Sequence, residues 1–324
     1  MSDQPLILAV PSKGRLQENT ALFFSRAGLA FNQSGGTRDY RATISGLADV
    51  DVQFVSAAEI ASLLACGAVH LGVTGEDLIR ETVHNADQVV ELLSPLGFGF
   101  ANVVVAAPQA WIDARTMADI HEIAADIRAR RGRKLRVATK YVNLTRAFFA
   151  EKGVTDYVIV ESAGATEGAP NAGSAEIIVD ITTSGATLNA NGLKVIDDGV
   201  ILRSEANLVA SLAADWSERA RSAARALLAR IAAEEQARKT REIRAALPET
   251  AELPLGAIVE PFHLAVQPRA DDAAVVLWCP EEQVFALVAA LQEAGAPTVS
   301  VRRLDYLFTA GNPLMERLLA RIGA

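Results

Sequence analysis

Short apolar runs alternate with segments of helical spacing along the first two thirds of the chain. The clearest runs, rich in Val, Ile and Leu, are residues 6–10, 69–74, 135–139, 156–161 and 176–181. Between them, apolar side chains recur at intervals of three and four residues, which predicts helices over residues 16–27, 57–66, 116–131 and 143–152. Strands that alternate with helices in this way are typical of an α/β fold.

The alternating pattern divides into two sets of elements. The first includes paired strands over residues 41–45 and 50–55, and the second begins at residues 97–108. Further strands are predicted over residues 193–197 and 201–211, and the later one returns the chain to the first set. We therefore expect a first lobe of residues 1–100 and 184–224 and a second lobe of residues 101–183.

The last hundred residues follow a different pattern. A helix is predicted over residues 214–246, with one stripe formed by Trp216, Ala220, Ala223, Leu227 and Ile231, and the segment "LPETAELPLG" ends it. Residues 273–308 are predicted as strand, helix and strand, because Val284, Leu287, Val288 and Leu291 share one helical face. We expect a small α+β domain over residues 225–324 that regulates or assembles the protein.

Composition narrows the class of protein. The 324 residues are 50% hydrophobic, which supports a large core, and the net charge of −8 argues against non-specific binding to nucleic acid. The apolar run near the N-terminus is too short for a signal peptide, and no stretch is long enough to span a membrane, so we expect a soluble, cytoplasmic protein. Cys66 and Cys279 stand alone, and both are predicted to be buried thiols.

The segment 177–193, "IIVDITTSGATLNANGL", carries the most specific chemical signal. A buried strand ends in Asp180 and then in a turn of small hydroxyl residues and glycine that opens a helix. Backbone N–H groups and the helix dipole at such a turn favour a phosphate, and an upstream carboxylate can hold ribose hydroxyls or orient hydrated magnesium. The same four residues from Ser184 to Thr187 also fit an ordinary helix cap with a tight turn.

Three other strand ends carry polar or ionic groups. Lys13, Gly14 and Arg15 follow the first strand, Asp77 begins a helix after "GVTG", and Lys140 follows residues 135–139. Ligands of open α/β sheets bind at the carboxyl ends of strands, so the four sites together favour a nucleotide or sugar phosphate. Taken singly, the cations also suit a solvated surface, and Asp77 suits the first turn of a helix.

With these residues in view, the chain resembles the ATP phosphoribosyltransferases, which catalyse the first step of histidine biosynthesis. The matching segments are "SKGRL", "HLGVTGEDLI", "VATKYVNLTRAFFAEKGV" and "EGAPNAGSAEIIVDITTSGATLNANGL", and the resemblance covers residues 5–225. The C-terminal part matches the long form of the family only in length, position and β-α-β pattern. The resemblance implies a two-lobed catalytic core similar to type II periplasmic binding proteins, with a small ACT-like α+β domain.

The resemblance also implies an activity and a site. N1 of ATP attacks C1 of phosphoribosyl pyrophosphate with magnesium present, and the expected product is phosphoribosyl-ATP. The expected catalytic residues are Lys13, Arg15, Glu161 and Asp180. The expected substrate-binding residues are Gly14, Arg38, Asp77, Lys140, Thr183, Ser184, Gly185, Ala186 and Thr187. A homo-oligomer, a dimer or a hexamer, and inhibition by histidine are further expectations, whereas the metal ligands stay unassigned.

The chain departs from the family pattern at a few positions. Ser56 stands where the family usually has a basic residue, and either Arg38 or Arg41 is a candidate for the missing cation. Residues 174–176, "SAE", replace the usual Leu-Ala-Asp. Two alternatives therefore stay open: a two-lobed binding or sensor protein, and a regulatory subunit without activity. The scattered histidines form no catalytic set, and His70 is predicted to be packed inside the fold.

Overall fold

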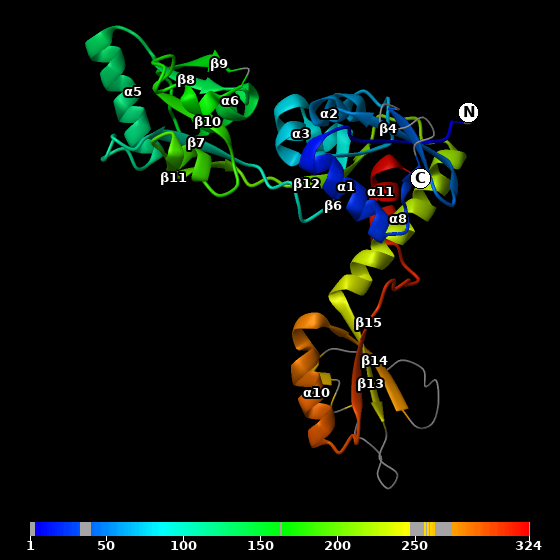
Figure 1. The fold of residues 1–324 in the computed structure, drawn as a ribbon. Helices are drawn as coiled ribbons and strands as arrows, with labels where there is room; N and C mark the ends of the chain where they lie inside the picture. Colours follow the sequence, from blue (N-terminus) through cyan, green and yellow to red (C-terminus); the bar gives the residue numbers. More distant parts are fainter. Residues whose placement is uncertain are drawn as a thin grey trace.

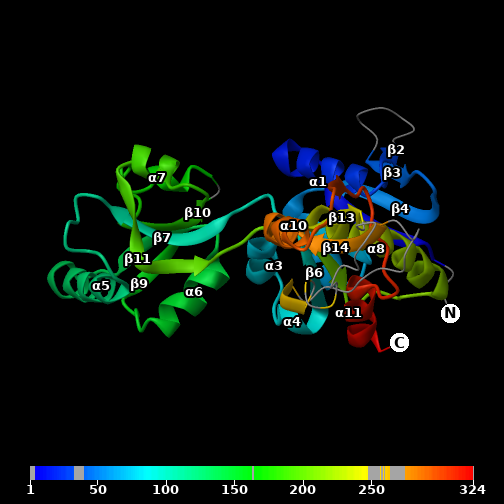
Figure 2. The same ribbon diagram turned by 90° about the horizontal axis from the view of Figure 1, so that it is seen from below.

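The structure is a computed structural model that describes residues 4–32, 40–162, 164–246, 256, 258, 260–262 and 274–323. Figure 1 shows two α/β lobes beside one another and a smaller sheet that a long helix, α8, joins to the first lobe. Both ends of the chain lie at the first lobe (Figures 1 and 2). None of the helices in the described part of the chain combines the length and the apolar character needed to span a membrane.

A seven-stranded sheet forms the first lobe, in the order β2-β3-β4-β1-β5-β12-β6. The central strand β1 (Leu6–Pro11) is parallel to β4 (Leu47–Val55) and β5 (Leu71–Gly75), and β12 (Ala206–Ser211) is antiparallel to β5. The remaining strands are β2 (Phe31–Asn32), β3 (Arg41–Ile44) and β6 (Val90–Pro95). The paired strands predicted over 41–55 are thus confirmed as β3 and β4.

Helices cover both faces of this sheet. Along β1, Leu8 and Val10 face one hydrophobic cluster, whereas Ala9 faces the other, as the alternation of side chains in a strand requires. The first face is covered by α1 (Gly14–Arg26), α8 (Glu218–Lys239) and α11 (Pro313–Ile322). The second face is covered by α2 (Ala57–Ala65), α3 (Glu76–Thr82) and α4 (Ala86–Val89).

A five-stranded sheet forms the second lobe, in the order β11-β7-β10-β8-β9. Three strands are parallel: β10 (Ile177–Thr182), β8 (Leu135–Thr139) and β9 (Tyr157–Glu161). The strands β7 (Asn102–Pro108) and β11 (Leu193–Leu202) complete the sheet in antiparallel pairing. Its helical elements are α5 (Met117–Arg131), α6 (Val142–Glu151), η1 (Thr166–Gly168) and α7 (Ala186–Ala190).

The chain returns to the first lobe later than the predicted boundary at residue 184. Residues 193–202 were expected in the first lobe, but as β11 they pair with β7 of the second sheet. Leu193 and Ile196 are buried in the second lobe, which fixes the strand there. Of β11 and β12, only β12 belongs to the first sheet. The strand predicted over residues 201–211 thus returns the chain to the first lobe in its second half.

The C-terminal sheet has three antiparallel strands, β14 (Ala274–Pro280), β13 (Thr240–Ala246) and β15 (Val299–Arg303), in the order β14-β13-β15. The strand–helix–strand prediction is confirmed, since η3 (Glu281–Gln283) and α10 (Val284–Glu293) connect the outer strands. The predicted helix end at residue 246 was wrong. The helix ends at Lys239, and β13 becomes the central strand because Ile243 and Ala245 alternate into the small core. A short helix, η2 (Glu260–Phe262), is also described.

Two helices of the expected C-terminal domain pack on the first lobe instead. Leu227 and Ile231 of α8 are buried there, although the predicted domain began at residue 225. After the small sheet, α11 returns to the same lobe and buries Leu314 and Leu318. The fold class is nevertheless the predicted one: a two-lobed α/β core with a small α+β sheet.

Candidate functional site

The predicted site residues follow the carboxyl ends of the parallel strands in both lobes. In the first lobe, β1 leads to Lys13 and Arg15, and β5 leads to Asp77. In the second, β8 leads to Lys140, and β10 leads to the loop that begins at Thr183. Such edges are the usual ligand-binding edges of open α/β sheets.

A hydrogen bond between buried side chains joins these two edges. The Tyr141 hydroxyl, in the second lobe, donates to Oδ2 of Asp77 in the first lobe at 2.7 Å. The Ser204 hydroxyl donates to Oδ1 of the same carboxylate at 2.9 Å, and the Asp77 side chain is buried. Burial, and then the charge of Asp77, raise the pKa of Tyr141, so the phenol stays protonated as a donor. Each oxygen of the Asp77 carboxylate thus accepts a hydrogen bond from a protein hydroxyl.

A second contact between the lobes caps α6. The amides of Asn143 and Leu144 donate to the Glu81 carboxylate of α3 at 2.9 and 3.0 Å. The Asn143 side chain also donates to the Glu81 carbonyl at 2.8 Å. A carboxylate at a helix N-terminus is stabilising because it meets unpaired amides and the positive end of the dipole. Sequence reasoning missed Glu81 and Tyr141, because each partner lies in the other lobe.

The two segments that connect the lobes run together. The Ala101 amide donates to the Ser204 carbonyl at 2.9 Å, and the Ala206 amide donates to the Phe98 carbonyl at 2.9 Å. The Gly97 amide donates to the Glu205 carboxylate at 2.7 Å. The loop after β10 is attached to the same connection, since the Thr183 hydroxyl donates to the Phe100 carbonyl at 2.9 Å. The predicted phosphate loop therefore lies where the lobes meet.

Local hydrogen bonds shape this loop. Gly185 has a φ of +76°, a left-handed conformation that glycine adopts without steric cost, and its amide donates to Thr182 Oγ1 at 2.8 Å. The Ala186 amide points at Ser184 Oγ at 3.4 Å. A Cβ added at Gly185 would meet no atom within 4 Å, so the loop faces open space. The amides of Gly185 and Ala186 thus have partners within the loop, and the exposed hydroxyls of Ser184 and Thr187 belong to its accessible polar surface.

A cavity of about 250 Å³ adjoins the loop. Its lining combines the connection between the lobes with the loop itself: Phe100, Ala101, Ile181, Thr182, Thr183, Ser184, Ala186 and Thr187. Ser184 and Thr187 are exposed. The turn is therefore open, and its hydroxyls are accessible to an anion.

Asp180 lies three residues before Thr183, where the loop begins, and is half-buried. Burial raises the pKa of its carboxyl group, against the opposing effects of the Ile181 amide, at 2.8 Å, and of the positive charge of Lys140. The structure thus brings Lys140 and Asp180 into electrostatic reach of each other. A carboxylate whose ionised form is disfavoured by burial is typical of functional sites.

The other predicted site residues are accessible. Lys13 and Arg15 are exposed at the start of α1, and Gly14 between them has a φ of +71° with open space around it. Within the described ranges, neither cation forms an ion pair. Glu161 is exposed at the end of β9, opposite Thr139 of β8. Arg38 lies outside the described residues.

The structure also shows the surroundings of four other residues that the sequence analysis singled out. Ser56 caps α2, accepting a hydrogen bond from the Glu59 amide at 3.2 Å, which accounts for a serine there. His70 is packed as predicted: its Nδ1 accepts from the Ile7 amide at 3.0 Å, and burial lowers its pKa. Cys279 is buried as predicted, but the prediction for Cys66 was wrong, because this thiol is exposed beyond the last turn of α2.

Glu176, part of the unusual "SAE", forms the most connected ion pair of the second lobe. Its carboxylate accepts from the guanidinium of Arg136 at 2.6 Å and of Arg133 at 3.0 Å, and from the Arg136 amide at 2.8 Å. Burial alone would raise its pKa, but these hydrogen bonds outweigh burial and lower the pKa to about 2. The residue therefore ties β8 to the segment before β10.

We expect Glu176→Gln to lower the free energy of unfolding at pH 7 by about 1–2 kcal/mol, since both guanidinium groups are a third exposed. A lowered pKa stabilises the fold above the ordinary value of 4.5, and that contribution disappears as the pH falls toward 2. Urea titrations at several pH values should show the difference from wild type shrinking over this window. The exposed Glu122→Gln is the control, and a difference independent of pH would contradict the assignment.

Comparison with known proteins places this chain in a family. The profile described as HisG, ATP phosphoribosyltransferase, matches residues 56–233, more than half of the chain. The ATP phosphoribosyltransferase of Rhodopseudomonas palustris (strain HaA2) is 56% identical over 322 residues, which cover 98% of each chain. The chain belongs to the ATP phosphoribosyltransferase family.

Other members of the family are similar over the same span. The ATP phosphoribosyltransferase of Nitrobacter winogradskyi is 58% identical over 320 residues, covering 97% of each chain. Among solved structures, the ATP phosphoribosyl transferase (HisG:HisZ) complex from Thermotoga maritima is 23% identical, with a TM-score of 0.53, and covers 70% of this chain and 95% of that one. This last similarity supports the fold of the ATP phosphoribosyltransferase core.

Proposed function

We propose that this protein transfers the phosphoribosyl group of phosphoribosyl pyrophosphate to N1 of ATP, the first step of histidine biosynthesis. The reaction yields phosphoribosyl-ATP and releases pyrophosphate. The observation that carries the proposal is the open hydroxyl-rich loop at residues 183–187, which begins three residues after a half-buried Asp180, at the junction of the lobes. Membership of the family supports the same reaction.

The chemistry needs positioning and charge more than a strong base. Displacement at the anomeric carbon of ribose develops positive charge on the sugar, while negative charge accumulates on the leaving pyrophosphate. Preorganised carboxylates and cations stabilise such a transition state. We assign Asp180 to hold the ribose hydroxyls and to face the positive charge, and the loop from Thr183 to Thr187 to receive the 5-phosphate.

The cations are assigned to the polyphosphates. Lys13 and Arg15 emerge from the carboxyl end of β1, where exposed side chains can reach phosphate oxygens, and Gly14 keeps the backbone open to close approach. Lys140, whose positive charge acts on Asp180, is assigned to the phosphate oxygens in the second lobe. Glu161 is assigned a supporting role at the end of β9.

Magnesium is the expected metal. No group of three or more His, Cys, Asp or Glu side chains suited to a metal ion occurs in the described part of the chain. This fits a magnesium ion held mainly by substrate phosphates and water with one protein carboxylate, for which Asp180 is the candidate. When bound, the metal would neutralise charge on the pyrophosphate.

Assembly, regulation and location belong to the same proposal. We expect a homo-oligomer, a dimer or a hexamer, in which the C-terminal sheet contributes to assembly, and we expect inhibition by histidine. A cytoplasmic location follows from the biosynthetic role.

The test of the function is release of pyrophosphate from ATP and phosphoribosyl pyrophosphate in the presence of magnesium. We expect turnover that requires both substrates. Binding of either substrate without release would support the two-lobed sensor. Absence of release together with no effect of Arg15→Ala on the histidine requirement of a complemented strain would support an inactive regulatory subunit.

Thr187→Val should weaken the binding of phosphoribosyl pyrophosphate by about tenfold, because it removes a hydroxyl offered to a phosphate. The side chain is exposed, so thermal stability should stay unchanged. Isothermal titration calorimetry measures the affinity, and Thr187→Ser, which keeps the hydroxyl, is the matched control. Equal affinities for Thr187→Val and wild type would remove Thr187 from the phosphate site.

A further inference from the structure

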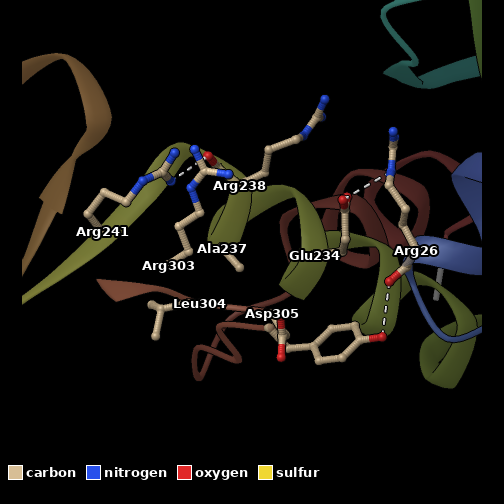
Figure 3. A pocket seen from close by; sticks show the side chains of 9 residues that line it. Arg26, Glu234, Ala237, Arg238, Arg241, Arg303, Leu304 and Asp305 are labelled. Atoms are coloured by element: carbon tan, nitrogen blue, oxygen red, sulfur yellow. Dashed lines mark hydrogen bonds and ion pairs between the residues drawn. The ribbon is translucent and has the colours of Figure 1, made fainter. Parts of the chain in front are cut away.

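A larger cavity lies away from the cleft, between the end of α1, the end of α8 and the strand β15. Its volume is about 460 Å³, within the range of pockets that hold small ligands. Its lining residues are Arg26, Glu234, Ala237, Arg238, Arg241, Arg303, Leu304, Asp305 and Tyr306, and Figure 3 shows them from close by. None of these residues belongs to the site described above.

The lining carries an excess of positive charge in an acidic protein. Four arginines face two carboxylates, although the whole chain has a net charge of −8. Two of the arginines have acidic partners: Arg26 pairs with Glu234 at 3.3 Å, and Arg241 pairs with Glu281, which lies outside the cavity lining. These two ion pairs neutralise only part of the positive charge of the cavity lining.

The other two arginines supply the surplus. Arg238 comes from α8 and Arg303 from β15, both are exposed, and neither forms an ion pair within the described ranges. In the view of Figure 3, Arg303 extends toward Arg241, while Arg238 extends toward the side on which Arg26 lies. Arg303 and Arg241 carry like charges that repel each other, and an anion bound between them would relieve that repulsion.

The frame of the cavity is fixed by hydrogen bonds. The Tyr306 hydroxyl donates to the Arg26 carbonyl at 3.0 Å, and the Leu307 amide donates to the Ala233 carbonyl at 2.9 Å. Tyr306 also packs on Gly28, where an added Cβ would come within 3.1 Å of the hydroxyl oxygen. The segment after β15 is therefore anchored to both α1 and α8.

We propose that this cavity is a second anion site that binds a phosphorylated small molecule. Guanidinium groups are suited to this class of ligand, because each offers paired N–H donors that match two phosphate oxygens. Arg26 belongs to the first lobe and Arg303 to the C-terminal sheet, so an occupant contacts both. Binding would thus restrain the sheet relative to the catalytic core.

Calorimetric titration of the full-length protein with inorganic pyrophosphate, without substrates, tests the proposal. Arg238→Gln and Arg303→Gln should each weaken one binding event by about tenfold. Asp305→Asn, an exposed neighbour of opposite charge, should strengthen the same event by about threefold. Arg15→Gln, in the cleft, should leave this event unchanged, which separates it from pyrophosphate bound as the reaction product.

The opposite effects of adjacent residues make the result decisive. All three variants of the cavity change exposed side chains, so their melting temperatures should match wild type. The proposal is overturned if all pyrophosphate binding is lost in Arg15→Gln, or if Arg303→Gln and Asp305→Asn bind like wild type. Either outcome leaves the proposed transferase function untouched, because that function rests on the cleft.

Discussion

Asp180→Asn is expected to lower kcat/KM for phosphoribosyl transfer by about a hundredfold to a thousandfold, because a charge facing the developing positive sugar is lost. The same change should leave the melting temperature unchanged or raise it. Burial raises the pKa of this group, so the ionised carboxylate opposes folding at neutral pH. Steady-state kinetics with both substrates and thermal unfolding at pH 7 measure the two effects.

The pH dependence of stability checks the sign of this argument. A raised pKa means that the carboxyl group favours the folded state at low pH, and that the benefit is lost as the pH rises through the folded pKa. The stability gained by Asp180→Asn should therefore grow over that rise in pH. Asp113→Asn, an exposed change in the same lobe, is the control. A loss of activity that comes with a lower melting temperature would make Asp180 a structural residue.

Asp77→Ala should cost about 3 kcal/mol of unfolding free energy, since it leaves the Tyr141 and Ser204 hydroxyls without their buried acceptor. Tyr141→Phe removes one of these bonds and should cost about 1 kcal/mol. Urea denaturation of the two single variants and the double variant gives the coupling between them.

The same experiment decides between two roles for Asp77. If the carboxylate joins the lobes, the coupling to Tyr141 is large and stability falls in both variants. If instead it binds substrate, as the sequence predicted, Asp77→Ala raises KM and leaves stability close to wild type. The Glu81 contacts to α6 are an independent link, so loss of Asp77 alone should not separate the lobes.

Most elements of both lobes and the main loop could be predicted from local sequence, although β2 and β6 were not among the predicted strands. Apolar runs such as residues 135–139 are strands because their side chains fill the sheet, and Gly185 marks a turn because its φ is positive. The order of strands brought the predicted residues to the carboxyl edges, as open α/β sheets require. The local sequence pattern was sufficient to predict those elements whose conformation depends mainly on residues nearby in the sequence.

Prediction failed where contacts with residues far away in the sequence determine the structure. The segment 240–246 has the composition of the helix before it, and it becomes a strand because β14 and β15 pair with it on both sides. The sequence places Asp77 in the first turn of a helix. It does not show that the carboxylate accepts a hydrogen bond from Tyr141 of the other lobe. Cys66 was predicted to be buried because its neighbours in the sequence are apolar, but it follows the last residue of α2 and is exposed.

The return of α11 to the first lobe makes the small sheet an insertion with two attachments. Shortening the chain after Lys239 would uncover an apolar surface on α8 and β6, because Leu314, Met315 and Leu318 would no longer cover it. A soluble minimal enzyme would instead require internal excision of the sheet, with α8 and α11 joined by a new linker.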